Sequence, residues 1–360
     1  VMIPFNMRSV RPNFGWFDMS YDLKRLTSPT VKVRRLGYIV SLTQILSRTP
    51  VPNLALPRML SRWSRDDHGL LSSYCLNLPV IRRTKQRITG EIKSKDAALR
   101  YIRTAQQMGF VVRVVQEWRS TKVGKVLSVL PATSNPFELS LGQIFLVLRQ
   151  LLMTDLGCLR AIVGIAGRRK STRDEAASFR RIMKGKYVSR WKKPTEYYSE
   201  NIKAPRLEWL TDLKLVRSWN TAANHVIYRQ GVDAILSHKW SPEQIEIKYP
   251  DRFYHCYGDF FKKPVVEWRT LEEDERRERL STLLKNSIEL FKPSAALDKI
   301  SADQFFTFST CTLLTERNIV SSRQDLEADL IQLTVGGRLP YRYVRMISHV
   351  DTGYIIRVNS

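Results

Sequence analysis

Two acidic residues and a lysine are the side chains in this sequence whose types and spacing could support catalysis. Asp233 is followed by the run Glu246-Ile247-Lys248. An acid on one segment and an acid-x-lysine run on the next strand can hold a divalent ion and activate water. However, the apolar residues around Asp233 fit a helix that would turn its carboxylate toward solvent, and Glu246 can pair with Lys248 on one face of a short strand. We therefore expect no catalytic residues here, with a metal-dependent nuclease as the alternative.

The remaining chemistry-bearing residue types form no recognisable site. The four cysteines and five histidines are scattered and lack the short spacing of a zinc site or a disulfide framework. The sequence contains no phosphate-binding loop, no glycine-rich dinucleotide fingerprint and no nucleophile elbow. We expect neither a cofactor nor a metal, and the sequence favours binding over catalysis.

Positive charge is the dominant chemical feature of the chain. Its 360 residues include 59 Lys and Arg against 34 Asp and Glu, for a formal net charge of +25. Residues 1–135 hold 23 basic and 7 acidic side chains, so the excess is concentrated in the N-terminal third. Such an excess needs a polyanion, and nucleic acid is the first candidate. We expect double-stranded DNA, and RNA is also possible.

Two windows concentrate this charge. The first precedes a predicted helix and contains Arg82, Arg83, Lys85, Arg87, Lys93 and Lys95. The second spans 168–193, has interleaved aromatic residues, and offers as contacts Arg168, Arg169, Lys170, Arg180, Arg181, Lys184, Lys186, Arg190, Lys192 and Lys193. Cations in such windows contact the phosphate backbone and add salt-sensitive affinity without base preference. A solvated surface loop is the alternative for the first window.

One stretch, residues 94–130, shows how the elements that carry these cations should be arranged. Apolar residues from Ala98 to Met108 recur at three- and four-residue intervals, so they predict one buried stripe of a helix. Ser94 or Asp96 can cap its start, and Gly109 supplies the left-handed residue that ends it. The run 111–118 is β-branched and aromatic, and a second apolar stretch follows at 126–129. We expect a hairpin whose polar tip is 119–122.

This order resembles the second half of a winged-helix domain. The resemblance rests on the turn Met108-Gly109-Phe110-Val111 and on a Thr-x-x-Gly-x-x-Leu pattern at Thr121, Gly124 and Leu127. It implies that the helix enters the DNA major groove while the hairpin, or wing, lies beside the backbone. Helix contacts to bases or phosphates would come from Arg100, Arg103, Thr104 and Gln107, and wing contacts to phosphates from Arg119, Lys122 and Lys125.

A second copy of this pattern follows. Leu213, Lys214, Leu215 and Val216 align with the turn at 108–111, and Gly231 falls where the first copy has Gly124. A divergent duplication explains the match, which predicts another winged-helix-like unit. Its helix carries Glu208 and Asp212, which phosphates would repel, so we expect that helix to pack against protein rather than read bases.

We expect an α+β protein, mainly helical, with tandem winged-helix-like units and short β hairpins. The expected parts are an N-terminal arm at 1–30, winged-helix-like units at 31–134 and 137–240, a mixed connector with a charged helix at 241–300, and a small C-terminal α+β unit at 301–360 that could be a third such unit. In the connector helix, Glu272 to Arg276 and Glu275 to Arg279 have the spacing of ion pairs.

The expected function is non-enzymatic binding of double-stranded DNA. Plasmid replication initiators and DNA-sensing subunits of defence or mobile-element systems share the tandem plan, so the resemblance implies a subunit of a larger bacterial or mobile-element complex. We expect a protein partner at the aromatic arm and at the second unit, no membrane contact, and a cytoplasmic location, nucleoid-associated if bacterial. A basic scaffold that binds RNA or an acidic protein is a further alternative.

Overall fold

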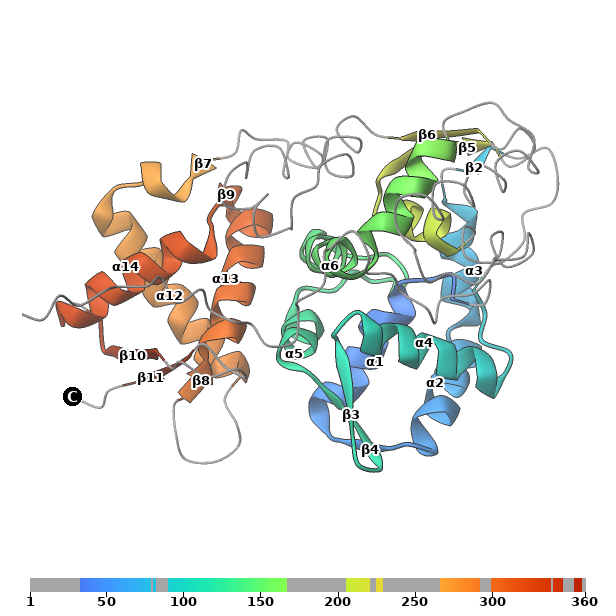
Figure 1. Cartoon of the computed structure of the whole chain (residues 1–360), viewed down its shortest axis with the longest axis horizontal. Helices are drawn as coiled ribbons and strands as arrows, with labels where there is room; N and C mark the ends of the chain where they lie inside the picture. The colour runs from blue at the N-terminus through green and yellow to red at the C-terminus, as the bar shows by residue number, and fades with distance from the viewer. Residues whose placement is uncertain are drawn as a thin grey trace, which may run out of the picture.

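The computed structural model describes residues 33–78, 80–81, 90–166, 205–220, 225–228, 266–291, 299–337, 339–345 and 353–357. Helices make up most of these residues, and the strands form sheets of two or three members (Figure 1). The expected mainly helical α+β class is therefore confirmed. The N-terminal arm and all residues from 229 to 265 lie outside the described part of the chain.

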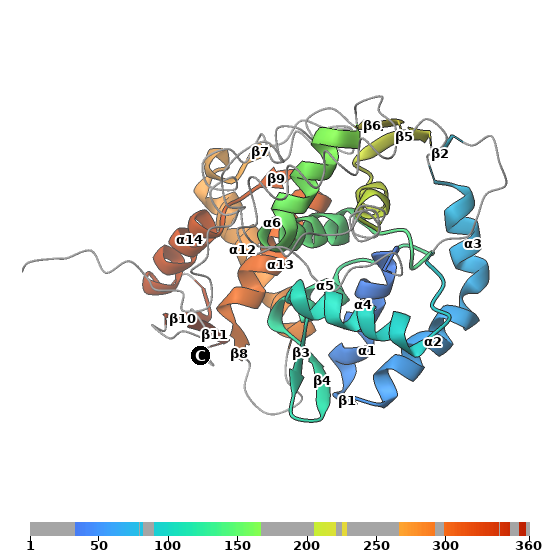
Figure 2. The same ribbon diagram turned by 45° about the vertical axis from the view of Figure 1, so that its right-hand side comes forward.

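The first part of the chain packs helices against a small three-stranded sheet. In order, its elements are α1 (Gly37–Arg48), β1 (Val51–Pro52), α2 (Ala55–Asp66), α3 (His68–Leu76), α4 (Lys95–Gln107), β3 (Val111–Val114), β4 (Glu117–Ser120) and α5 (Lys122–Val129). Strand β4 is central and pairs antiparallel with both neighbours, through Val51 opposite Trp118 and Val111 opposite Ser120. Figure 2 shows the β3–β4 hairpin extending below the helices. We call this part the first unit.

An aromatic cluster fixes the helices of the first unit. Tyr38 of α1 lies with its ring centroid 4.9–5.0 Å from those of Trp63, Tyr101 and Phe137. Its hydroxyl is 2.6 Å from the Ser64 hydroxyl, which also accepts the Ile92 backbone N–H. Each aromatic pair of this kind contributes roughly 0.5–1.5 kcal/mol beyond the burial of its area. The cluster therefore sets how α1, α2 and α4 lie against one another.

The hairpin differs from its expected register. The turn that joins β3 to β4 is Val115–Gln116, so the expected tip at 119–122 was wrong. Thr121 instead caps helix α5, because its hydroxyl accepts the Gly124 N–H at 3.0 Å. A Cβ on Gly124 would lie 2.0 Å from the Phe110 carbonyl oxygen, which explains the glycine. The Thr-x-x-Gly-x-x-Leu pattern thus begins a helix, and Lys122 and Lys125 belong to α5 rather than to the wing.

A long apolar helix and a second hairpin follow. The long helix is α6 (Leu141–Ala166). Residues 205–212 form a short helix that leads into β5 (Val216–Asn220) and β6 (His225–Tyr228). Strand β2 (Val80–Ile81) pairs parallel with β5, so this sheet joins the first part of the chain to the second. One cluster of buried apolar side chains extends from Val33 to Val216, so both parts share a core.

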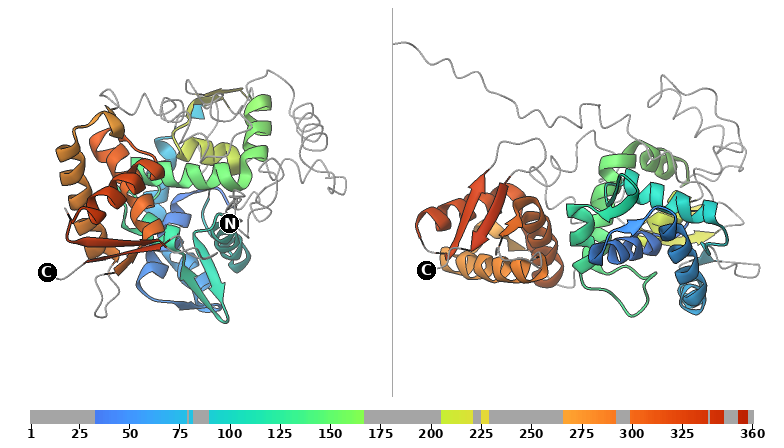
Figure 3. Two further views of the ribbon diagram at one scale, coloured as in Figure 1. Left: turned by 60° about the vertical axis from the view of Figure 1, so that its left-hand side comes forward. Right: turned by 90° about the horizontal axis from the view of Figure 1, so that it is seen from below.

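The C-terminal unit has its own sheet and core. Its elements are β7 (Val266–Glu267), a 3-10 turn (Trp268–Thr270), α12 (Glu273–Phe291), β8 (Lys299–Ser301), α13 (Ala302–Arg317), β9 (Ile319–Val320), α14 (Arg323–Val335), β10 (Tyr341–Arg345) and β11 (Gly353–Arg357). Residues after 300 thus contain both helices and a hairpin, which is the α+β content expected of them. Figure 3 shows this unit beside the rest of the described chain. Helix α13 contributes to both cores, because Phe308 and Leu314 pack with the first core, and Phe305 and Leu313 with the second.

The two expected ion pairs of the connector helix have different outcomes. Glu275 and Arg279 form the expected pair at 2.6 Å. The pair expected between Arg276 and Glu272 is replaced by another, in which the Arg276 side chain lies 3.1 Å from Asp329 of α14. That contact is partly buried and links α12 to α14.

The first unit and the C-terminal unit share one topology. In each, a helix precedes a short strand, two or more helices follow, and a hairpin completes the sheet. The short strand pairs antiparallel with the second strand of the hairpin, giving the orders β1-β4-β3 and β8-β11-β10. Helix α14 therefore occupies in the C-terminal unit the place that α4 occupies in the first unit.

Candidate nucleic-acid interface

Helix α4 begins and ends at the residues expected from the sequence. The Ser94 hydroxyl accepts the Ala97 N–H at 3.2 Å, which caps the start. At the other end, Gly109 has a φ of +79°, and the Phe110 N–H donates to the Ala105 carbonyl at 2.9 Å. This left-handed exit turns the chain back along the helix and directs it into β3. The hairpin therefore leaves from a fixed point on α4.

The same exit occurs in two further places. After residues 205–212, Lys214 has a φ of +56°, and the Leu215 N–H donates to the Leu210 carbonyl at 2.9 Å, as Phe110 does to Ala105. The aligned positions 108–111 and 213–216 thus form the same turn. After α14, Gly337 has a φ of +64°. All three helices are followed by a hairpin, so helix, left-handed turn and hairpin form a repeated structural unit.

The exposed face of α4 carries some of the expected contacts. Arg103 and Gln107 are exposed, whereas Arg100 is partly buried and lies 3.1 Å from Asp96. Thr104 is fully buried, and its hydroxyl donates to the Arg100 carbonyl at 2.8 Å. The prediction of a base or phosphate contact at Thr104 was therefore wrong. Gln106 is also exposed, so it joins Arg103 and Gln107 on the outward face.

The cations expected on the wing are divided between two elements. Arg119 lies exposed on β4, where it pairs with Glu117 at 3.0 Å. Arg113 on β3 is also exposed, although the sequence did not single it out. Lys125 is exposed on α5, and Lys122 of that helix is partly buried. The hairpin therefore presents two exposed guanidinium groups, and they lie on opposite faces of it, because Arg113 is paired with Trp118, the neighbour of Arg119.

A stripe of arginines on α2 was missed by the sequence reasoning. Arg58, Arg62 and Arg65 are all exposed and lie four and three residues apart, so they share one face of the helix. The other face carries Leu56 and Leu60 in the core. Arg62 lies 3.8 Å from the exposed Asp66, a contact that screening by solvent makes weak. The helical spacing of the arginines after Pro57 is the sequence pattern that could have predicted this stripe.

The two basic windows lie mostly beyond the described residues. Lys93 is exposed just before α4 and pairs with Glu91 at 3.2 Å, and Lys95 is exposed as the first residue of α4. The other expected contacts of the first window lie outside the described residues, namely Arg82, Arg83, Lys85 and Arg87. The same holds for the second window, namely Arg168, Arg169, Lys170, Arg180, Arg181, Lys184, Lys186, Arg190, Lys192 and Lys193.

The short helix 205–212 is buried within the chain, as its acidic side chains led us to expect. Glu208 and Asp212 accept hydrogen bonds from the buried Arg35 at 2.5 and 2.7 Å, and Glu208 also pairs with Arg34. Burial alone would lower the pKa of Arg35, but Asp212 and Glu208 outweigh it and raise that pKa above its usual value. Arg35 therefore stays charged, and this helix serves to anchor the chain before α1.

The anchored arginines also connect to α4. The Tyr101 hydroxyl accepts the backbone N–H groups of Arg34 and Arg35 at 2.8 and 3.0 Å. Tyr101 is fully buried on the inner face of α4. Because these bonds join residue 34, α4 and the helix 205–212 into one hydrogen-bonded set, the outer face of α4 is held rigidly relative to the rest of the unit.

Helix α14 has a different exposed face. Its outward residues are uncharged: Gln324, Ala328, Ile331, Gln332 and Val335. Its acidic residues are partly buried and have partners within the unit. Asp325 pairs with Arg269, Asp329 accepts a hydrogen bond from the Trp268 indole at 2.5 Å, and Glu327 accepts one from the Tyr343 hydroxyl at 2.8 Å. This helix therefore offers a phosphate neither a cation nor a basic stripe on its outward face.

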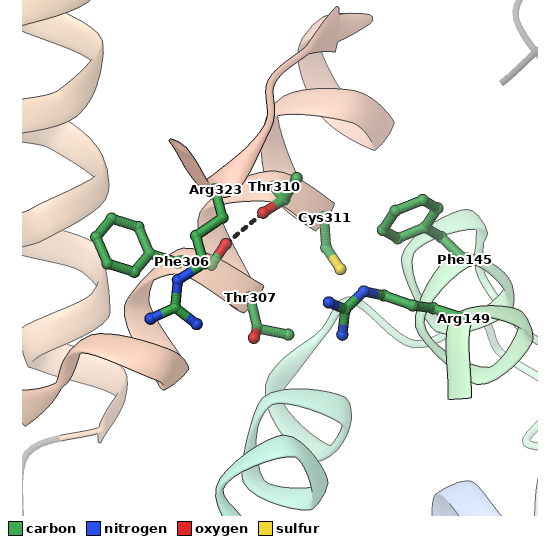
Figure 4. Close-up of a pocket in the computed structure, with 7 residues that line it drawn as sticks. All are labelled: Phe145, Arg149, Phe306, Thr307, Thr310, Cys311 and Arg323. Atoms are coloured by element: carbon green, nitrogen blue, oxygen red, sulfur yellow. Dashed lines mark hydrogen bonds between the residues drawn. The ribbon is translucent and has the colours of Figure 1, made fainter. Parts of the chain in front are cut away.

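A small pocket lies between α6 and α13 (Figure 4). Its volume is about 30 Å³, room for on the order of two water molecules. Arg323 at one side pairs with Asp303 at 2.8 Å and lies over the Phe306 ring. The lining residues are Phe145, Arg149, Phe306, Thr307, Thr310, Cys311 and Arg323. The pocket is too small for a substrate and belongs to the contact between the two cores.

The alternative catalytic set is not placed by the structure. Asp233, Glu246 and Lys248 all lie outside the described residues. Among the residues that are described, no group of three or more His, Cys, Asp or Glu side chains is arranged to hold a metal ion. Within that same part of the chain, no helix has the length and apolar character needed to cross a membrane.

Comparisons with known proteins identified no relative of this chain. No family model, no curated protein and no solved structure matches the chain.

Proposed function

We propose that this chain is a double-stranded-DNA-binding protein that uses its first unit as a winged helix, without catalysis of its own. Helix α4 acts as the recognition helix, α2 crosses the phosphate backbone and the β3–β4 hairpin is the wing. The observation that carries the proposal is the exposed arginine stripe of α2 beside the exposed Arg103, Gln106 and Gln107 of α4. Helices α2 and α4 are in contact, and the proposal assigns these exposed groups to one DNA-facing surface.

The chemistry of this surface suits duplex DNA. Arginine donates two hydrogen bonds to the major-groove edge of guanine, and glutamine bonds adenine in a similar way. The α2 arginines, Arg113 and Arg119 supply charge to the backbone, which gives affinity without sequence preference. In helix-turn-helix proteins a helix packed on the recognition helix crosses the backbone in this manner, and α2 is a helix that contacts α4. The rigid hold on α4 through Tyr101 lowers the entropy lost on binding.

The topology of the units supports a tandem winged-helix plan. The first unit and the C-terminal unit have the same element order and strand order, and a third helix with the same exit and hairpin lies between them. Their surfaces differ, because the outward residues of α14 from Gln324 to Val335 are uncharged and the helix 205–212 is buried. In this proposal the first unit binds DNA, and the C-terminal unit contacts protein subunits of a larger DNA-processing complex.

A titration of fluorescent nucleic acids tests the proposal. Duplex DNA, single-stranded DNA and RNA of equal length are titrated with the chain, with and without magnesium. We expect the tightest binding to duplex and no cleavage in either condition. The matched pair Arg62→Ala and Arg342→Ala locates the site, since both arginines are exposed but Arg342 lies on β10 of the C-terminal unit. Equal affinity for all three nucleic acids, or equal losses in the two variants, would reject the proposed interface, and magnesium-dependent cleavage would favour the nuclease alternative.

A further inference from the structure

The tip of the β3–β4 hairpin has an unusual backbone. Only Val115 and Gln116 separate the last pair of the ladder, Val114 opposite Glu117. Val115 has a φ of +54°, in the left-handed region. Two-residue hairpin turns that need this region normally place Gly, Asn or Asp there, and a β-branched residue in it is an outlier. Glycine would adopt this backbone conformation with less strain than valine. The presence of valine therefore indicates a function for its side chain.

The tip presents aliphatic side chains to the outside. Val115 is 84% exposed, and Val114 beside it is also exposed. Leu54, which is 70% exposed, lies on the neighbouring loop between β1 and α2. That loop is bound to the hairpin turn, because both the backbone N–H and the side-chain amide of Asn53 donate to Gln116 at 2.9 Å. Leu54 and Val115 therefore protrude from two adjoining turns at one end of the sheet.

Positive charge flanks this aliphatic tip. Arg58, four residues after Leu54, begins the exposed stripe of α2, and the exposed Arg113 lies two residues before Val115 on β3. Within the described first unit, the acid nearest the tip in sequence is Glu117, and Arg119 pairs with it at 3.0 Å. A surface with an apolar centre and a cationic border matches a partner with an anionic border and an apolar interior. Duplex DNA is such a partner, with phosphates outside and stacked bases inside.

We infer that Val115 and Leu54 form a wedge that enters between neighbouring base pairs of the bound duplex and opens that step. The inference rests on the proposed function, since it concerns the same DNA-bound first unit. Apolar side chains inserted in this way unstack a step and kink the duplex, which brings more of the DNA onto the protein. Flexible pyrimidine–purine steps and mismatches unstack most easily, so the preferred DNA has such a step opposite the hairpin tip.

A substitution in the turn can remove the wedge side chain without destabilising the fold. Val115→Gly removes the aliphatic side chain and also relieves the left-handed backbone, so the fold is expected to melt at the same temperature or higher. Leu54→Ser removes the second side chain. Val335→Ser is the matched control, because Val335 is likewise 84% exposed but lies at the end of α14.

The experiment uses the full chain with a duplex that contains one central mismatch and a 2-aminopurine beside it. Binding is followed by anisotropy, unstacking by the rise in 2-aminopurine fluorescence, and bending by energy transfer between the duplex ends. The wild-type chain and Val335→Ser are expected to raise the fluorescence, to shorten the end-to-end distance and to prefer the mismatched duplex several-fold over a matched one. Val115→Gly and Leu54→Ser are expected to lose these signals and the preference for the mismatched duplex, while still binding the matched duplex.

Binding of the wild-type chain with no fluorescence rise and no bend would overturn the wedge while leaving the proposed function intact. Signals that persist in Val115→Gly and Leu54→Ser would do the same. Failure of the wild-type chain to bind any duplex would remove both the wedge and the proposed function.

Discussion

Replacing Asp155 with alanine is expected to destabilise the chain strongly. Asp155 on α6 accepts hydrogen bonds from Arg206 at 2.5 and 2.8 Å, and both side chains are fully buried. The substitution would leave the Arg206 guanidinium charged and buried beside an empty space. Removal of one partner of a buried pair costs about 3–5 kcal/mol. Because whole-protein stabilities are about 5–15 kcal/mol, this loss is a large fraction of the total.

Thermal unfolding followed by circular dichroism measures this effect. We expect the midpoint for Asp155→Ala to fall by on the order of 10 °C. Arg206→Ala should cost a similar amount, and the double replacement Asp155→Leu with Arg206→Met should recover most of the loss, because it removes both buried charges together.

An exposed pair provides the control for this measurement. Glu138 lies 3.0 Å from Lys214, and both side chains are substantially exposed. Glu138→Ala should therefore change stability by less than about 1 kcal/mol. If Asp155→Ala were no more destabilising than Glu138→Ala, the description of a buried pair that fastens the helix 205–212 to α6 would be refuted.

The remaining predictions concern the helix exits and the α4 surface. Lys214→Gly should stabilise the chain by roughly 1 kcal/mol, since it removes a side chain from a left-handed position. Gly109→Ala should destabilise the chain by at least as much, although a Cβ there meets nothing closer than the Gln150 amide oxygen at 3.7 Å. Chemical unfolding measures both changes, and a shift of the opposite sign in either variant would contradict this explanation. Arg103→Ala and Gln107→Ala should change the ranking of duplex sequences by about 1–3 kcal/mol at the contacted base, whereas Arg62→Ala should weaken all sequences alike. Thr104→Ala should leave that ranking unchanged, because its hydroxyl is buried; a binding screen over randomised duplexes compares all four variants.

Local signals explain why part of the fold was predictable. Ser94 and Gly109 marked both ends of α4, and the match of 213–216 to 108–111 identified a shared turn before any backbone angle was known. The hairpin register was missed because its turn, Val115–Gln116, contains none of the usual turn residues, while the polar run 119–122 looked like a tip. Thr121 acts as a helix cap there, a role that Thr fills as readily as a place in a turn.

The candidate site was predicted in part for similar reasons. Thr104 is three residues after Tyr101 and four before Met108, so helical spacing already placed it on the buried face. The arginine stripe of α2 had a regular spacing that could have been found. In contrast, the pairing of Arg35 with Glu208 and Asp212 joins residues more than 170 positions apart. Neither that contact nor the parallel β2–β5 pairing has a local sequence signal, because only the tertiary fold brings the segments together.

The salt dependence of duplex binding tests the central claim most directly. Each phosphate contact contributes about 0.9 to the slope of log affinity against log salt concentration. A variant with Arg58, Arg62 and Arg65 all replaced by alanine should therefore bind with a slope shallower by roughly 2–3, and Arg342→Ala should keep the wild-type slope. A wild-type slope in the triple variant would show that α2 does not lie on the phosphate backbone and would contradict the proposed interface.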